Sequence, residues 1–271
     1  PPMASAQVKS CLLLAGLLAE GETTVREPVQ TRDHTERMLA AAGARIRRSG
    51  EELTVSPAER LESGDIPVPA DFSSAAFFIA AALIIPGSEL TLREVGINAT
   101  RIGLLTVLAR MGVEMGGPEM RGKGEGAPSG ATRLDEGATR DVVPAMTVDE
   151  ISEPGPEPRA TLHVRSSDLT GTTVSADEVP AAIDELPLIA LLGCFAEGGT
   201  VVGGAEELRH KESDRIAGVV EGLTGLGAEI EARPDGFVVQ GTGGVRGGRL
   251  DARGDHRLAM LGAIAGLASR E

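Results

Sequence analysis

Eleven consecutive apolar residues occupy positions 75 to 85: Ala75-Ala76-Phe77-Phe78-Ile79-Ala80-Ala81-Ala82-Leu83-Ile84-Ile85. A helix made of these residues has no polar face, so it must be buried on all sides, and it is too short to cross a bilayer. Asp71 and the pair Ser73-Ser74 precede the run, and Gly87 follows it. The stretch therefore predicts a helix at the centre of a folded unit.

The same plan recurs along the chain. The plan occurs three times, and a fourth copy begins near residue 255. Each copy has an apolar run, a glycine, a strand-like segment, a basic residue and a helix that ends at glycine. The apolar runs cover residues 11–19, 75–85, 186–196 and 258–268. This period predicts a repeated helix–strand–helix–strand module. The second helix of each module is amphipathic, so we expect buried central helices shielded by sheets and outer helices.

The composition restricts the partners. The 271 residues allow one large domain or two moderate ones, and with five Phe, no Trp and no Tyr the core must be largely aliphatic. The net charge of −14 argues against nucleic acid and against an anionic membrane surface. Cys11 and Cys194 lie inside apolar runs, which predicts buried free thiols and fits a reducing cytoplasm. No signal peptide or membrane span is visible, and the chain reads as a piece of a longer protein.

Two regions do not follow the module. Residues 116–160 are rich in glycine, proline and acidic residues, which predicts a flexible insertion. The stretch Pro67-Val68-Pro69-Ala70 comes directly before the second module. We expect it to be a crossover between domains.

Polar residues stand just ahead of the apolar runs: Ser5 and Gln7, Ser73-Ser74, Asp184, and His256-Arg257. The first turn of a helix has unpaired N–H groups and a partial positive charge. If the buried helices run parallel, their first turns converge on one face. That face would bind a phosphate or a carboxylate.

The stretch Lys211-Glu212-Ser213-Asp214-Arg215 combines cations and acids, and Lys211 is one of only three lysines beside 23 arginines. Such a group suits an anionic substrate that undergoes proton transfer. A solvated helix start, capped by Ser213 or Asp214, explains the same residues. Asp184-Glu185 has a similar alternative, an acid pair favoured by the helix dipole. Arg257 is a stronger indication of an anion-binding site, because an arginine that is buried needs an anion as its partner.

Three other patterns in the sequence are weaker evidence for a function. The stretch from Thr31 to Glu36 resembles a capping box, with Thr31 or Asp33 as the cap. The histidines and cysteines lack the spacing of metal ligands, so no metal site is expected. The glycine pairs form no dinucleotide-binding fingerprint.

Taken together, the motifs resemble the EPSP synthase (3-phosphoshikimate 1-carboxyvinyltransferase) family, nearly from end to end. The class with Ser-Ala-Gln rather than Ser-Ser-Gln is the more similar one. The resemblance is carried by residues 3–10, 31–36, 183–185, 207–215 and 255–257. It implies an inside-out α/β barrel fold with two domains, each made of three βαβαββ units whose central helices point their first turns into the interdomain cleft. Residues 1–69 would end the first domain, and residues 70–271 would form most of the second, so the fold is incomplete.

The family's reaction moves the enolpyruvyl group of phosphoenolpyruvate to the 5-hydroxyl of shikimate 3-phosphate and releases phosphate, in the shikimate pathway of aromatic amino-acid biosynthesis. By resemblance, Ser5, Ala6 (through its backbone) and Gln7 contact shikimate 3-phosphate, and Arg32 binds its phosphate. Arg215 and Arg257 would clamp phosphoenolpyruvate, because a guanidinium suits bidentate binding of a carboxylate or a phosphate.

The resemblance also implies catalytic roles. Asp184 would bind and deprotonate the attacking hydroxyl, Glu212 would shuttle the proton at the enol carbon, and Lys211 would touch the substrate hydroxyl and the reacting centre. Both half-reactions need proton transfer and strong charge neutralisation. No metal or organic cofactor is implied, and the enzyme is expected to be cytoplasmic and monomeric.

Some of the family's motifs are missing from these 271 residues. The early Lys-Ser pair, the Gly-Asn-Ala-Gly-Thr loop with its following arginine, and a late lysine do not occur in them. We therefore expect no turnover by this chain alone. Two other functions stay open: a UDP-N-acetylglucosamine enolpyruvyl transferase, which shares the fold and the chemistry, and a non-catalytic module with the same fold.

Overall fold

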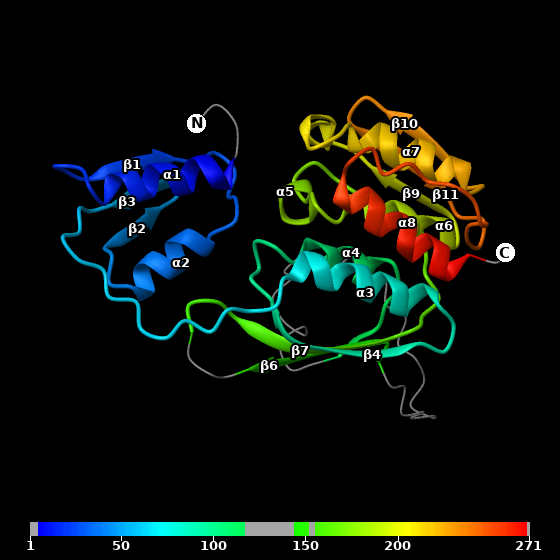
Figure 1. Cartoon of the computed structure of the whole chain (residues 1–271), viewed down its shortest axis with the longest axis horizontal. Helices are drawn as coiled ribbons and strands as arrows, with labels where there is room; N and C mark the ends of the chain where they lie inside the picture. Colours follow the sequence, from blue (N-terminus) through cyan, green and yellow to red (C-terminus); the bar gives the residue numbers. More distant parts are fainter. Residues whose placement is uncertain (1–4, 117–143, 152–154, 270–271) are drawn as a thin grey trace, which may run out of the picture.

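A computed structural model describes residues 5–116, 144–151 and 155–269 of the chain (Figure 1). The first module lies to one side of the rest and is joined to it by an extended segment. It consists of α1 (Ala6–Gly16), β1 (Thr23–Arg26), α2 (His34–Ala41), β2 (Ile46–Ser49) and β3 (Glu52–Val55).

The remaining elements form a second, larger body. Its first part consists of α3 (Phe72–Ile84), β4 (Glu89–Gly96), α4 (Gly103–Arg110), β5 (Met115–Gly116), β6 (Met146–Ile151) and β7 (Arg159–Arg165). Next come β8 (Thr173–Val174), α5 (Val179–Ala182), α6 (Leu186–Phe195), β9 (Gly199–Val202), the 3-10 helix η1 (Glu206–His210), α7 (Arg215–Gly225), β10 (Glu229–Arg233) and β11 (Gly236–Gln240). α8 (His256–Ala268) is the last element.

The strand order confirms the repeat. The three sheets contain the orders β1-β3-β2, β4-β7-β6 and β9-β11-β10, so in each one the last strand of the hairpin lies between the other two. A short parallel neighbour also borders two of them, since β8 pairs with β9 and Ala70 bridges to Val95 of β4. The unit from β8 to β11 thus reads βαβαββ, as expected, and the unit from Ala70 to β7 follows the same order with the two-residue strand β5 in addition.

The prediction of buried central helices is confirmed for α3 and α6, whereas α8 is buried on one side only and exposes Leu267. α3, α6 and α8 pack against one another, and every residue from Leu186 to Cys194 of α6 is buried. The apolar run 75–85 lies within or next to α3, and only Phe78 of its large side chains is exposed. Asp71 and Asp255 cap α3 and α8 by accepting backbone N–H bonds.

The same prediction is wrong for the first run. α1 packs one side on the sheet of β1 and β3, while Val8, Leu12, Leu14 and Leu18 are exposed, Leu18 by 87%. Cys11 is exposed as well, so only Cys194 is the buried thiol that the sequence predicted. The apolar composition of a helix shows that it can be buried, but it does not show which element covers it. None of the described elements covers this side of α1.

The predicted insertion at 116–160 also needs correction. β6 pairs along its whole length with β7, and Met146 and Val148 are buried on the core face. The alternation of these apolar residues with Thr147 and Asp149 is the period of a half-buried strand, which the acidic composition concealed. Residues 117–143 and 152–154 of the predicted insertion lie outside the described residues.

Two separate groups of apolar side chains form the core of the described residues. The smaller one runs from Leu13 to Val55, and the larger one from Phe72 to Ala265. The Pro67–Ala70 stretch passes between them. None of the helices in the described part of the chain is long and apolar enough to span a membrane.

Candidate functional site

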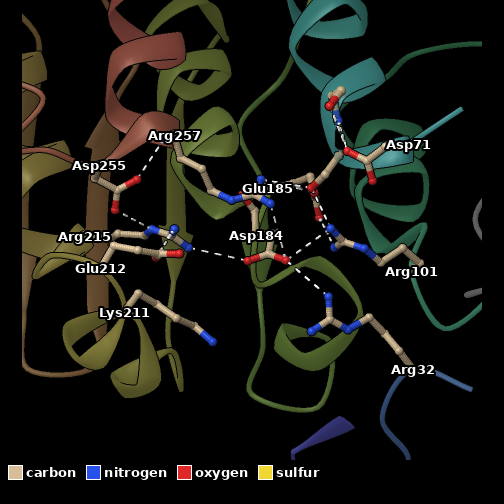
Figure 2. Close-up of polar contacts among 12 residues, drawn as sticks. Arg32, Asp71, Arg101, Asp184, Glu185, Lys211, Glu212, Arg215, Asp255 and Arg257 are labelled. Carbon is tan, nitrogen blue, oxygen red and sulfur yellow. Dashed lines mark hydrogen bonds and ion pairs between the residues drawn. The ribbon is translucent and has the colours of Figure 1, made fainter. Parts of the chain in front are cut away.

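Asp184 lies at the centre of a ring of guanidinium groups (Figure 2). Its Oδ2 is 3.1 Å from Arg101 Nη2, 3.5 Å from Arg257 Nη2 and 3.7 Å from Arg32 Nη1. Its Oδ1 is 3.5 Å from Arg215 Nη1. The four arginines come from four different segments, so the fold brings them together. Arg32 is the one that belongs to the first module.

The first turns of the three central helices meet at this point, as the sequence predicted. Arg257 at the start of α8 donates from Nη1 to the backbone oxygen of Asp184 at 3.0 Å and to Ser73 Oγ, in the first turn of α3, at 2.9 Å. Ser73 in turn donates to Glu185, the residue that begins α6. The helix dipole is therefore not the only partner of the acid pair at residues 184–185, because both carboxylates are also held by side chains of other elements.

Glu185 is fully buried and is a second acid of the site. Its Oε2 is 3.3 Å from Arg101 Nη1 and its Oε1 is 3.8 Å from Arg257 Nη1. Ser73 Oγ also accepts a bond of 2.6 Å from Arg101 Nη2. Arg101 is thereby bound to three groups at once.

Arg215 opens α7 and is almost completely buried. Its Nε donates to Asp255 Oδ2 at 2.9 Å and its Nη2 to Glu212 Oε2 at 2.5 Å. Asp214 caps the same helix through the N–H of Ala217, which confirms the capping alternative for that residue alone. Glu212 remains half exposed, so its carboxylate lies between the buried guanidinium and solvent.

Burial and charge act against each other at the two acids. Burial on its own would raise the pKa of Asp184, but Arg257, Arg101, Arg32 and Lys211 outweigh it and lower that pKa below the ordinary value. Burial dominates at Glu185 and raises its pKa, although Arg101 and Ser73 oppose the effect. Asp184 is therefore ionised at neutral pH, and it can accept a proton without first losing one.

The structure places the other predicted residues near this ring without joining all of them to it. Lys211 Nζ pairs with Glu207 rather than with Asp184. Ser5 caps α1 by accepting from the N–H of Val8. Ala6 and Gln7 line a pocket of about 640 Å³, and Arg32 lies on the same pocket. Arg32 thus connects the α1 pocket with Asp184.

The capping box predicted for residues 31–36 does not form. Asp33 makes no side-chain cap bond, and Glu36 pairs instead with the buried Lys9, 2.8 Å away. Asp33 accepts from Asn98 Nδ2 at 2.6 Å, which joins the two bodies. Glu36 thus has a buried lysine as its partner, and Asp33 has a residue of the second body. Such partners are distant in the sequence, so local spacing does not predict them.

Sequence reasoning placed Ser73 at the converging helix starts, but it gave no role in the site to Arg101, Glu185 or Asp255. One signal for Arg101 was available: Thr100-Arg101 occupies the place in the second module that Thr31-Arg32 occupies in the first. Across the described ranges, no three His, Cys, Asp or Glu side chains gather in the way that a metal ion requires.

Comparison with known proteins identifies relatives along the whole chain. The family model for EPSP synthase (3-phosphoshikimate 1-carboxyvinyltransferase) matches residues 2–271. The 3-phosphoshikimate 1-carboxyvinyltransferase of Desulforudis audaxviator (strain MP104C) is 45% identical over 270 residues, which are 100% of this chain and 56% of the relative. The one of Methylococcus capsulatus (strain ATCC 33009 / NCIMB 11132 / Bath) is 46% identical over 98% of this chain and 54% of its own length.

A solved structure agrees with the fold. The structure of EPSP synthase from Acinetobacter baumannii superposes with a TM-score of 0.81 at 40% identity, over 99% of this chain and 55% of that one. The predicted fold class is therefore confirmed. The chain spans about half the length of the curated relatives that it matches. The ring around Asp184 joins segments of the repeated modules, and curated relatives match this chain from end to end, so the chain belongs to the EPSP synthase family.

Proposed function

We propose that the protein to which this chain belongs transfers the enolpyruvyl group of phosphoenolpyruvate to the 5-hydroxyl of shikimate 3-phosphate, with release of phosphate. The observation that carries the proposal is the convergence of four arginines from separate segments on one ionised aspartate. Both substrates are polyanions, and their reaction needs a base beside strong positive charge.

The arginines of the site would bind anions by exchanging partners, because each of them already faces a carboxylate. Four guanidiniums face the carboxylates of Asp184, Glu185, Glu212 and Asp255. Arg257 and Arg215 would turn from Asp184 towards the carboxylate and phosphate of phosphoenolpyruvate, since a guanidinium presents a planar fork to such groups.

Proton transfer is assigned to two acids. Asp184 would take the proton of the attacking 5-hydroxyl, because it is ionised and lies beside the arginines that would hold the substrates. Glu212 would deliver a proton to the enol methylene and accept one back from the methyl group as phosphate leaves. Its half-exposed position beside Arg215 supports this role, since it can exchange protons with solvent. Lys211 would support the reacting centre by leaving Glu207.

The pocket beside α1 is the proposed site for shikimate 3-phosphate. Ser5, the backbone of Ala6, and Gln7 lie at the first turn of α1, where unpaired N–H groups favour a phosphate. Arg32 lines the pocket and also contacts Asp184, so it would bind the phosphate of a ligand whose hydroxyl reaches Asp184. Residues 1–69 and 70–271 would belong to two domains that close on this ligand, in a monomeric, cytoplasmic enzyme.

The test uses the full-length protein from the parent gene. Phosphate release is measured with phosphoenolpyruvate plus either shikimate 3-phosphate or UDP-N-acetylglucosamine. We expect turnover with shikimate 3-phosphate alone, and no turnover by the 271 residues without the rest. Turnover with the nucleotide sugar would favour the related transferase.

The variant Asp184→Asn should reduce kcat by about 10²–10⁴-fold, the contribution typical of a general base. Asp168→Asn is the matched control, since Asp168 is exposed next to the last turn of α3, at the opposite end from Ser73. Turnover that is equal in wild type, Asp184→Asn and Glu212→Gln would instead place catalysis elsewhere in the full-length protein and make this part a non-catalytic module.

A further inference from the structure

We propose that Arg101 is a positioning residue: it stays bound to Asp184 while the other arginines turn to the substrates, and it leaves Oδ1 of Asp184 as the oxygen that accepts the proton. The inference rests on the proposed role of Asp184 as the base.

Arg101 is fixed by the protein itself. Its Nη2 donates to Ser73 Oγ at 2.6 Å and lies 3.1 Å from Asp184 Oδ2, while Nη1 lies 3.3 Å from Glu185 Oε2. Both terminal nitrogens are thus occupied by side chains. The side chain of Arg101 is 11% exposed, as is that of Arg257, so Arg101 is distinguished by its closer pairing with both Asp184 and Glu185 and not by its burial.

Glu185 explains why Arg101 stays in place. Its side chain is fully buried, and its nearest cation is Arg101, closer than Arg257. Moving Arg101 towards a ligand would leave a buried carboxylate short of its partner, which is costly. Arg32 has no comparable anchor, since its contact to Asp184 is the longest of the four and a third of its side chain is exposed.

The contacts of Asp184 differ between its two oxygens. Arg101, Arg257 and Arg32 all approach Oδ2, whereas Arg215 Nη1, at 3.5 Å, approaches Oδ1. Arg215 is also held by Asp255 and Glu212 on its other nitrogens. If Arg101 stays on Oδ2 while Arg215 turns to a substrate, Oδ1 is the oxygen that loses its cation and becomes free to accept a proton. A displacement of about 1 Å at such a group costs about 10²-fold in rate.

Removing Arg101 alone would leave Glu185 without its nearest cation and could unfold the site. We therefore compare Glu185→Gln with the double variant Arg101→Gln/Glu185→Gln, in which no buried charge at position 185 needs a partner. The two proteins differ only at Arg101. Thermal unfolding of both checks that the double variant folds.

The first measurement does not need activity. The full 271-residue chain is labelled with ¹³C at the aspartate carboxyls, and Asp184→Asn assigns the signal of Asp184. The other charged groups that face this carboxylate from the packed elements are unchanged within the pair: Arg32, Lys211, Glu212, Arg215, Asp255 and Arg257. We expect a higher pKa for Asp184 in the double variant, because a neighbouring positive charge is lost.

The second measurement uses the full-length enzyme. In the double variant kcat should fall about 10²-fold while KM changes little, and the acid limb of kcat/KM should move to higher pH, since Asp184 is protonated over a wider range. An unchanged pKa, or a kcat equal to that of Glu185→Gln, would overturn the inference. If wild-type enzyme shows no turnover, the proposed function fails, and the carboxyl titration still decides whether Arg101 controls Asp184.

Discussion

Replacing Lys9 by methionine is expected to destabilise the first module by about 3 kcal/mol. The lysine is 1% exposed, and its Nζ lies 2.9 Å from Glu27 Oε1 and 2.8 Å from Glu36 Oε1. Breaking a buried ion pair from one side costs about 3–5 kcal/mol, because the remaining charge is left without a partner. Arg48 also reaches both carboxylates, at 3.0 and 3.5 Å, so we expect the lower end of that range.

The free energy is measured by hydrogen exchange of the amides of α1 and β1. The apolar core of this module is separate from that of the second body, so a local measurement is needed. A loss of 3 kcal/mol corresponds to about 150-fold faster exchange. Lys211→Met is the matched control: the same residue type, paired with an exposed glutamate, should change exchange in its own segment by less than about 1 kcal/mol.

A second variant tests the physical reason. Glu36 Oε2 is buried and has no hydrogen-bond partner among the described residues, so this acid depends on Lys9 and Arg48 through its other oxygen. Lys9→Met/Glu36→Gln should therefore recover part of the lost protection, because one of the two uncompensated charges is removed. Protection in Lys9→Met equal to that of wild type would refute the reasoning, as would a double variant that is less stable than Lys9→Met.

Two further predictions concern thiols and glycines. Native protein should react with one equivalent of thiol reagent at Cys11, and with two only after unfolding, because Cys194 is buried and burial raises its pKa to about 12. Counting thiols with and without denaturant checks this, and fast native reaction of both cysteines would contradict it. Gly241→Ala should destabilise the second body by about 2 kcal/mol, since the new Cβ would lie 1.8 Å from a backbone oxygen. Gly266→Ala, with open space around it on α8, should stabilise by up to about 1 kcal/mol. Equal melting temperatures for the two variants would rule this out.

The central helices were predictable because their composition permits only one environment. An apolar run without a polar face has to be surrounded, and α6 and most of α3 are. α1 shows the limit of this argument. Its run is as apolar, but the described elements cover only one side of it, so composition indicated a tendency to be buried and not the partner. The prediction for β6 failed for the opposite reason. Its acidic residues concealed the alternation of apolar and polar residues that is typical of a strand.

A site residue could be predicted where its type and its local sequence permit few roles. Arg257 opens an apolar helix, where a guanidinium needs an anion, and it meets Asp184 and Glu185. Arg101 opens no apolar run, so nothing local indicated that it is buried. Its role comes from tertiary contacts to α3 and α6 that only the fold supplies.

The stretch from Thr31 to Glu36 illustrates how local reading and tertiary structure diverge. Three successive residues, Arg32, Asp33 and His34, each contact the second body, at 3.7, 2.6 and 2.9 Å respectively. Their partners are Asp184, Asn98 and Glu157. Glu27 holds the same stretch from within the first module by accepting from the N–H of Thr31 at 2.9 Å. A ligand that takes Arg32 away from Asp184 would therefore replace one of three adjacent contacts between the bodies and leave the other two in place. In the proposed function, ligand binding and the joining of the two bodies would thus depend on one short segment, to which Lys9 is linked by a hydrogen bond to the backbone oxygen of Thr31.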